Sequence, residues 1–366
     1  MFDRIQLIDV KIGSQLVGQV AQTPEQKIVF EYSPSFLKTG FSISPFHLPL
    51  KPGLFTAPDE PFAGNFGVFN DSLPDGWGNL LLDRFLISQG ISLSSLSALD
   101  RLSLIGSNGM GALQYFPDQK IQSEFSSTEL AFLAQEVHKV ISETEYSEHL
   151  EMLIAVGGSP GGARPKALIK VNHESWMVKF PSSLDPPDIG CIEFEYSRIA
   201  RKCGIEMPQT QLFENKYFGV KRFDRKGDER IHMHTASGLL NASHRYPSLD
   251  YSEIMKASFA LTRNINDSYK LFRRMVFNVL TGNKDDHSKN FSFLFSEKEW
   301  SLAPAYDLAP SGGFNGNHST TIAGQGQPSR SNIFDVGTQI GLKQNRLLQL
   351  FDEVYENCAS IRLGHW

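Results

Sequence analysis

The chain has 366 residues, of which 40% are hydrophobic and 20% are charged. This length suffices for two or three domains with buried cores, and the composition excludes a disordered or fibrous protein. Lys and Arg number 35 against 40 Asp and Glu, a net charge of −5. Direct, non-specific binding of nucleic acid is therefore disfavoured, because neutralising phosphates requires a basic surface.

Cysteine usage and hydropathy predict a cytoplasmic protein. The three cysteines, Cys191, Cys203 and Cys358, form no CxxC pair and cannot build a disulfide framework, which favours a reducing compartment. The first twenty residues include charged side chains and hence no apolar signal core. No stretch approaches the ~18–20 apolar residues of a membrane span, so no membrane segment is expected.

Residues 1 to about 118 are predicted to be rich in β-structure. Polar and apolar residues alternate in 5–10 and in 28–32, which is typical of short strands. Apolar stripes at helical spacing predict helices near 78–86 and about 127–142.

The middle of the chain is predicted to mix strands and a helix. Residues 157–162 contain four glycines and form a loop by composition. The expected elements that follow are strands over 166–171 and 176–180, a helix over 192–203 that ends at Gly204, and a strand over 217–222.

From about residue 250 the pattern becomes mostly helical. A helix over 267–281 is expected to be capped by Asn266 or Asp267 and stopped by Gly282. Residues 308–329 contain five glycines and no charged side chain, which predicts a mobile loop. The other expected elements are a helix over 252–263, a hairpin over 291–302 and helical structure in the last thirty residues.

The most specific motif is GNKDDHSKN, residues 282–290. Asp285 and Asn290 lie five residues apart, between a predicted helix and a predicted hairpin. This is the spacing of a protein-kinase catalytic loop, in which the Asp accepts the proton of the substrate hydroxyl and the Asn binds Mg²⁺. The hairpin returns the chain to Asp307, where a kinase has a second metal ligand, and such oxygen donors suit Mg²⁺.

Two other interpretations of these residues stay open. The adjacent carboxylates and Asn290 could cap a loop, with Asp307 as the N-cap of a helix. Alternatively, His287 could bind Zn or Fe together with His232 and His234, although no helical carboxylate–histidine spacing supports such a site.

Lys179 is the next candidate, because it lies within an apolar predicted strand and buried lysines are rare unless paired. Glu193 and Glu195 follow at the start of a predicted helix. In kinases a strand lysine paired with a helix glutamate contacts the ATP phosphates. By itself, Lys179 would be interpreted as an edge-strand lysine whose charged end extends to solvent. The order of the motifs along the chain, which is glycine loop, lysine, glutamate, Asp-x4-Asn and second Asp, favours a kinase instead.

The glycine loop matches neither GxxxxGK[ST] nor GxGxxG, so a Walker-A or Rossmann site has no support. Its four glycines could still direct backbone N–H groups at phosphates. Ser159 within it would by itself be a turn residue.

Together these motifs resemble the HipA serine/threonine kinase toxins of bacterial type II toxin–antitoxin modules. The resemblance covers roughly residues 10–340. The segments that carry it are FNDSLPDGWG (69–78), GMGAL (109–113), VGGSPGGARPK (156–166), VKF (178–180), VKRFDR (220–225), DDHSKNF (285–291) and PAYDL (304–308).

The resemblance implies a role for each motif. Asp285 would be the catalytic base, with Asn290 and Asp307 as Mg²⁺ ligands. Lys179 would bind the ATP phosphates, with Glu193 as its better-aligned partner and Glu195 as the alternative. Ser159 would be an autophosphorylation site whose modification withdraws the loop from the site. Lys221, Arg222 and Phe223 would form the hinge against adenine, largely through backbone groups. The remaining ATP-binding candidates are Gly158, Gly161 and Gly162, with His287 and Lys289 as further candidates for phosphate contact.

The resemblance also implies the fold, the domains and the partners. The fold would be α+β and two-lobed, of protein-kinase type, with a β-rich N-terminal subdomain (1–120), a nucleotide-binding α/β lobe (121–222) and a helical catalytic lobe (223–366). The substrate would be a translation component such as an aminoacyl-tRNA synthetase. The partner would be a HipB-like DNA-binding antitoxin, through which operator DNA is contacted mostly indirectly.

Two alternative functions stay open. The protein could be a nucleotide-binding co-repressor without significant kinase activity, or a kinase for a lipid or a small molecule.

Overall fold

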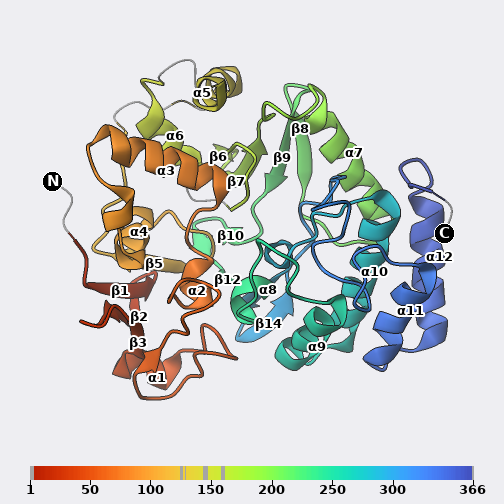
Figure 1. Ribbon diagram of the computed structural model, residues 1–366, viewed down its shortest axis with the longest axis horizontal. Helices are drawn as coiled ribbons and strands as arrows, with labels where there is room; N and C mark the ends of the chain where they lie inside the picture. Colours follow the sequence, from red (N-terminus) through yellow and green to blue (C-terminus); the bar gives the residue numbers. More distant parts are fainter. Residues whose placement is uncertain (1–3, 124–126, 128, 143–146, 158–160, 365–366) are drawn as a thin grey trace. The chain divides into compact units, whose positions relative to one another are not determined.

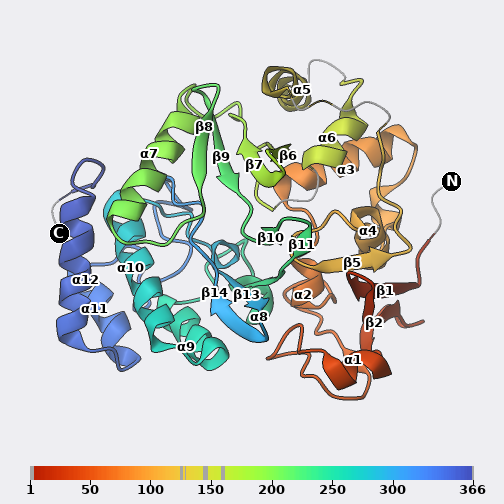
Figure 2. The same cartoon turned by 180° about the vertical axis from the view of Figure 1, so that it is seen from behind.

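The computed structural model describes residues 4–123, 127, 129–142, 147–157 and 161–364. It divides into two compact units, unit 1 with residues 1–191 and 211–233, and unit 2 with residues 192–210 and 234–366. Both units combine antiparallel sheets with helices (Figures 1 and 2). The finer division at residues 120 and 222 stays a prediction.

Unit 1 begins with a five-stranded sheet in the order β4-β3-β2-β1-β5. Its strands are β1 (Leu7–Ile12), β2 (Gln15–Gln22), β3 (Ile28–Tyr32), β4 (Phe55–Thr56) and β5 (Leu113–Phe116). The expected strand over 28–32 is confirmed, and the first strand begins two residues later than predicted. Alternating residues on one face, among them Ile8, Val10 and Val20, are fully buried in the core of this part.

This region also contains helices that the β-rich prediction missed. They are α1 (Pro34–Thr39), α2 (Gly67–Asn70) and α4 (Ala98–Ile105), in addition to the expected helix, α3 (Gly76–Ser88). Two of the missed helices begin at strong caps: Ser33 precedes Pro34 in α1, and Ser97 forms a capping box with Asp100 in α4. These helices are six and eight residues long, too short for periodicity to identify.

The second sheet of unit 1 has the order β6-β7-β9-β8. Its strands are β6 (Lys166–Val171), β7 (Glu174–Lys179), β8 (Thr210–Phe213) and β9 (Tyr217–Lys221), and the neighbouring helices are α5 (Leu130–Ser142) and α6 (Leu150–Gly157). Asn172 and His173 both have positive φ, 50° and 65°, which gives the two-residue turn that suits a twisted hairpin. The predicted strands and the helix over 127–142 are confirmed to within a few residues.

A buried ion network in unit 1 joins the VKRFDR segment to the GMGAL segment. Asp224 is 1% exposed. Its carboxylate accepts two hydrogen bonds from Arg222, at 2.9 and 2.6 Å, and one from Arg225 at 2.7 Å. The Gly111 N–H also donates to Asp224 at 2.8 Å, and Arg225 donates to the carbonyl of Gly109 at 3.0 Å. Burial would raise the pKa of Asp224, but Arg222 and Arg225 together lower it.

Replacing Asp224→Asn should destabilise unit 1 strongly. The change leaves Arg222 and Arg225 buried without a counter-charge, a cost of about 3–5 kcal/mol. Urea denaturation followed by fluorescence measures this loss. The control Asp228→Asn alters a fully exposed carboxylate and should leave the midpoint unchanged. An unchanged midpoint for Asp224→Asn would show that the network does not stabilise the fold.

Helix α7 (Ile189–Lys202) runs from unit 1 into unit 2, and Gly204 follows it with φ 74°. The other elements of unit 2 are α8 (Ala236–Leu239), α9 (Tyr251–Thr262), α10 (Ile265–Thr281), η2 (Ser288–Asn290), β13 (Ser292–Ser296), β14 (Glu299–Leu302), α11 (Arg330–Gln339) and α12 (Gln344–Asn357). The strand β12 (His232–Thr235) completes a three-stranded sheet with β13 and β14. In unit 1, β10 (Arg225–Lys226) pairs with β11 (Glu229–Arg230). Figure 1 shows α9 and α10 in blue-green and α11 and α12 in blue.

Helix α10 is central to unit 2. Its buried face, which includes Leu271, Phe272 and Met275, lies in the main core of the unit. The predicted stop at Gly282 is confirmed, because Gly282 has the left-handed conformation with φ 70°. The predicted cap was wrong: Asn264 is the N-cap, and its side chain accepts a hydrogen bond from the N–H of Asn266 at 3.1 Å.

Residues 308–329 are ordered by hydrogen bonds, which corrects the expected mobile loop. The Ser311 N–H donates to the carbonyl of Gly282 at 3.0 Å, and the Lys284 N–H donates back to Ser311 at 3.2 Å. The Ser319 N–H donates to the carbonyl of Lys284 at 3.0 Å. The composition predicted a mobile loop wrongly, because the uncharged polar and backbone groups of this segment form hydrogen bonds with other parts of the chain. The segment buries His318, Thr320 and Ile322.

Across the described parts of the chain, no helix combines the length and the apolar character needed to cross a membrane.

Candidate active site

The loop that carries Asp285 is a sharp exit from helix α10. Gly282 turns the chain, the Asn283 N–H donates to the carbonyl of Asn278 at 2.9 Å, and a short 3-10 helix ending at Asn290 leads into β13. The loop therefore lies between the most buried helix of unit 2 and its sheet, so both of its ends are fixed by packed elements.

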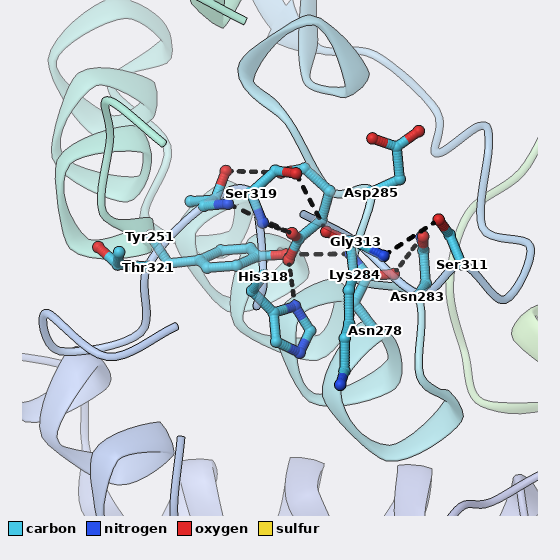
Figure 3. Close-up of polar contacts among 12 residues, drawn as sticks. Tyr251, Asn278, Asn283, Lys284, Asp285, Ser311, Gly313, His318, Ser319 and Thr321 are labelled. Carbon is cyan, nitrogen blue, oxygen red and sulfur yellow. Dashed lines mark hydrogen bonds and ion pairs between the residues drawn. The ribbon is translucent and has the colours of Figure 1, made fainter. Parts of the chain in front are cut away.

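Asp286 is the buried anchor of this loop and is 1% exposed. Its carboxylate accepts hydrogen bonds from the Tyr251 hydroxyl at 2.7 Å, the Ser319 N–H at 2.9 Å and the Thr320 N–H at 3.3 Å, and pairs with His318 Nδ1 at 2.9 Å. Figure 3 shows Tyr251, His318 and Ser319 converging on this point. Burial raises the pKa of Tyr251, so the hydroxyl stays protonated and donates.

Asp285 behaves differently from its neighbour. It is exposed, and in Figure 3 its carboxylate points away from the converging side chains of Tyr251 and His318. Asp286 thus has the capping role that the sequence left open for both carboxylates, while Asp285 presents its side chain to solvent, where a substrate hydroxyl could reach it.

Asn290 forms a hydrogen bond within the same loop. Its Nδ2 donates to the backbone carbonyl of Asp285 at 2.8 Å, which turns the amide oxygen away from that carbonyl. Of the other loop residues, Lys289 is half-buried, and its carbonyl accepts a bond from the Tyr306 hydroxyl at 2.6 Å. The His287 ring lies 5.9 Å from that of His244.

Asp307 has a strained backbone beside this loop. It is exposed and has φ 57°, a left-handed conformation that costs most residues free energy and that concentrates at functional sites. Its carbonyl accepts a bond from Asn283 Nδ2 at 3.1 Å, and Asn283 Nδ2 also donates to Asn278 Oδ1 at 3.0 Å. Helix α10 therefore holds the Asp307 turn through Asn278 and Asn283.

Arg274 of α10 holds the strand that leads to Asp307. It is 2% exposed, and its Nη2 donates to the carbonyl of Ala303 at 2.6 Å. Burial lowers the pKa of Arg274 to about 10. Arg274, Asn290 and Asp307 line one small cavity of about 10 Å³ within unit 2, so the two predicted metal ligands contribute to the same cavity.

The donor set fits Mg²⁺ better than a transition metal. Asn290 and Asp307 offer an amide oxygen and a carboxylate, the hard donors that Mg²⁺ prefers. Among the described residues, no three His, Cys, Asp or Glu side chains form a cluster that could hold a metal ion. His232 Nε2 instead lies 2.9 Å from the carbonyl of Ile43, so the alternative Zn or Fe site gains no support.

Most of the residues predicted to bind nucleotide lie in unit 1. Lys179 ends β7, and its Nζ lies 5.7 Å from the centroid of the Phe218 ring. Glu193, on the part of α7 that belongs to unit 2, is 5% exposed, whereas Glu195 forms an exposed ion pair with Arg198. This burial favours Glu193 over Glu195, and the pairing with Lys179 stays a prediction.

The predicted hinge side chains have structural partners. Lys221 pairs with Glu174, and Arg222 is 8% exposed and forms the bidentate pair with Asp224. The Arg222 N–H donates to the carbonyl of Ser175 at 2.8 Å. Any contact with adenine from this segment would therefore come from other backbone groups or from the half-buried Phe223.

Half of the glycine loop can be described. Gly158 and Ser159 lie outside the described residues, so their predicted roles are untested. Gly161 and Gly162 pack against the start of α3, where the Gly162 N–H donates to Asp75 at 3.2 Å. Lys166, which was not among the predicted site residues, is 5% exposed and donates a hydrogen bond to the carbonyl of Gly161. Its position as the first residue of β6 gave no signal of this burial.

Asp286→Asn should destabilise unit 2, whereas Asp285→Asn should not. The first change removes a buried charge that accepts bonds from Tyr251 and two backbone N–H groups, a loss of about 3 kcal/mol or more. The second alters an exposed side chain. Tyr251→Phe should give an intermediate loss of about 1–3 kcal/mol, because the carboxylate keeps its other partners. Urea midpoints measure all three. Equal midpoints for Asp286→Asn and Asp285→Asn would contradict the assignment.

Comparison with solved structures establishes the fold class. The structure of a Shewanella oneidensis complex of HipA, HipB and its operator DNA includes a chain similar to this one, with a TM-score of 0.74 and 19% identity over 97% of this chain and 90% of that chain. The predicted α+β, kinase-like fold of HipA type is therefore confirmed.

Family models and relatives give the family. The model of the HipA N-terminal domain matches residues 8–116, and that of the HipA-like C-terminal domain matches residues 158–361. Because the second model alone spans more than half of the sequence, the chain belongs to the HipA family.

Two relatives are similar to this chain over most of its length. The "Serine/threonine-protein kinase toxin HipA" of Shewanella oneidensis is 23% identical over 341 residues, which are 82% of this chain and 74% of that protein. The "Putative kinase Y4dM" of Sinorhizobium fredii is 23% identical over 340 residues, 83% of this chain and 77% of that protein.

Proposed function

We propose that this protein is an ATP- and Mg²⁺-dependent serine/threonine protein kinase and the toxin of a HipA/HipB-type toxin–antitoxin module. The observation that carries the proposal is the arrangement of three side chains in unit 2. Asp285 is exposed, Asn290 is bonded to its backbone, and Asp307 lines the same cavity as Asn290. This arrangement meets the needs of a catalytic base beside two metal ligands.

In the proposed reaction, Asp285 accepts the proton of the substrate hydroxyl. The hydroxyl oxygen forms a bond to the γ-phosphorus of ATP while the bond from that phosphorus to the β–γ bridging oxygen breaks, which leaves ADP. Asn290 and Asp307 would hold Mg²⁺, which neutralises charge on the phosphates when bound. Lys179, oriented by Glu193, binds phosphate oxygens. Catalysis then comes from positioning and fixed charges rather than from a covalent intermediate.

The remaining predicted contacts extend this proposal to the rest of the nucleotide. Backbone groups of Gly158, Gly161 and Gly162 would face the phosphates, and the segment Lys221–Phe223 would lie against adenine. His287 and Lys289 are candidates for phosphate contact from the catalytic loop. The family membership supports all of these contacts. His287 and Lys289 are also supported by their positions close to Asp285 in the same loop.

The substrate and partners are proposed from the same family. The Shewanella oneidensis relative was solved with HipB and operator DNA, and we propose that a HipB-like antitoxin binds this chain and contacts operator DNA for it. The net charge of −5 supports indirect contact with DNA. The proposed target is a translation component such as an aminoacyl-tRNA synthetase.

Asp285→Asn and Asp307→Asn should each lower phosphoryl transfer without unfolding the protein. Loss of a general base costs about 10²–10⁴-fold in rate, and Asn tolerates the left-handed backbone that Asp307 adopts. Transfer of labelled γ-phosphate to protein in a cell lysate measures the rate, and Asp352→Asn, an exposed carboxylate on α12, is the matched control. Wild-type protein that binds Mg-ATP without any transfer would favour a co-repressor, and label in lipid or small molecules would favour another kinase class.

Incubation with Mg-ATP should also add a phosphate to Ser159 of the protein itself. The resemblance assigns autophosphorylation to this residue, and transfer requires the Asp285 base. Mass spectrometry of the intact protein and its peptides should find the modification in the wild type and lose it in Asp285→Asn. Transfer to other proteins with Ser159 unmodified would refute autophosphorylation and leave the kinase assignment in place.

A further inference from the structure

The first residues of helix α3, which the proposed reaction does not use, contact the described half of the glycine loop. Asp75, Gly76 and Trp77 belong to the FNDSLPDGWG segment, and the loop follows α6. Both stretches lie in unit 1, and α3 and α6 lie side by side in both views of the chain (Figures 1 and 2). The contact therefore joins the regions that the two family models match.

Gly162 exchanges two hydrogen bonds with the start of α3. Its N–H donates to Asp75 Oδ2 at 3.2 Å, and its carbonyl accepts from the Trp77 N–H at 3.2 Å. Asp75 is the N-cap residue of α3, a position where an aspartate commonly accepts a bond from the first turn of its own helix. In the described structure its side chain makes no such capping bond. The carboxylate of Asp75 thus serves the glycine loop instead of its own helix.

The side chains of Asp75 and Lys166 lie where side chains at positions 161 and 162 would be. A Cβ built on Gly161 would lie 2.8 Å from Asp75 Oδ2, and one built on Gly162, where φ is 96°, would lie 2.5 Å from Lys166 Nζ. Lys166 also donates a hydrogen bond to the carbonyl of Gly161. Larger residues at these positions would displace the two side chains, so the glycines preserve both contacts.

The backbones around these bonds are also closely packed. A Cβ built on Gly76 would lie 3.0 Å from Ala163 Cα, and a Cβ built on Gly157 would clash with the carbonyl oxygen of Lys166. Gly157 ends α6 and Lys166 begins β6, so the second approach holds the two ends of the loop against each other. The partners here are backbone atoms, which cannot rotate aside as a side chain can.

Lys166 connects this contact to the proposed phosphate-binding lysine. It is directly opposite Lys179 in the register of β6 and β7. Such residues of antiparallel strands have their side chains on the same face, with Cβ atoms about 4.5–5.5 Å apart. Like charges at opposite positions repel, and an anion bound beside them would reduce that repulsion. The phosphate chain of ATP is an anion of this kind.

We propose that Asp75 and Lys166 form a clamp that positions Gly161 and Gly162 for the phosphates of ATP, so that the start of α3 sets the affinity for the nucleotide. The proposal rests on the proposed kinase function and adds positioning residues to it. A loop that is held in its binding conformation loses less conformational entropy when the ligand binds. Asp75 acts only through the N–H of Gly162 and takes no part in phosphoryl transfer.

The test compares Asp75→Ala with Asp75→Asn in the full-length protein. Alanine removes the acceptor, whereas the amide oxygen of asparagine can still accept the Gly162 N–H. A fluorescent ATP analogue, methylanthraniloyl-ATP with Mg²⁺, should bind Asp75→Ala about tenfold more weakly, as expected for one lost hydrogen bond to a charged group. Asp75→Asn should bind it nearly as the wild type does. In transfer to lysate proteins, the KM for ATP should rise by the same factor in Asp75→Ala, with kcat nearly unchanged.

The matched control is Asp83→Ala. Asp83 is a carboxylate on the same helix, and it pairs with Arg101 at 3.2 Å. Its replacement should leave the affinity for the ATP analogue unchanged. A loss as large as that of Asp75→Ala would show that any damage to α3 lowers this affinity, and would overturn a specific role for Asp75.

Hydrogen exchange of the nucleotide-free protein tests the clamp separately from the kinase assignment. Exchange in the peptide that contains Gly162 should be slow in the wild type and in Asp75→Asn, and faster in Asp75→Ala. Unprotected exchange in the wild type would overturn the clamp without the need for any variant. Unchanged exchange and ATP affinity in Asp75→Ala would also overturn it, while leaving a kinase.

Two further outcomes have distinct meanings. Tighter binding of the ATP analogue by both Asp75 variants would overturn the clamp, because the carboxylate would then compete with the phosphates for the loop. Faster exchange in Asp75→Ala, together with no nucleotide binding by the wild type, would support the contact between Asp75 and the loop and contradict the proposed kinase.

Discussion

The hydrogen-bonded carboxylate of Asp286, buried in unit 2, is the interaction on which the loop between α10 and β13 depends. Removing a charge from water is costly unless hydrogen bonds replace the lost hydration. Asp286 receives them from α9 through Tyr251 and from the segment around Ser319. Three stretches of chain that are distant in the sequence are thereby joined at one point (Figure 3). Because Asp286 is fixed inward, its neighbour Asp285 is directed outward.

The same network extends to the predicted metal ligands. Tyr251 accepts a bond from Asn278 at 3.0 Å, Asn278 accepts one from Asn283, and Asn283 donates to the carbonyl of Asp307. Asn290 in turn binds the backbone of Asp285. Helix α10 therefore holds the turn of Asp307 through the side-chain amides of Asn278 and Asn283, and Asn290 stabilises the loop that carries the proposed base. A site of this kind is preorganised, so the protein need not reorganise its dipoles during the reaction.

The sequence predicted the parts of this arrangement that depend on local chemistry. Gly282 as a helix stop, the hairpin after Asn290 and the kinase-like spacing to Asp307 could all be identified from neighbouring residues. The assignment of Asp286 to the interior could not, because its partners lie about 35 residues away on both sides. The order in residues 308–329 depends on the same distant bonds, and composition alone therefore predicted a mobile loop.

The most direct test of the account is a crystal structure of the protein with Mg²⁺ and a non-hydrolysable ATP analogue. The account predicts Mg²⁺ on the oxygens of Asn290 and Asp307, the γ-phosphate facing Asp285, and Lys179 on the phosphate chain. A nucleotide bound elsewhere, or a metal ion held by other side chains, would contradict the assignment of this site as a kinase centre.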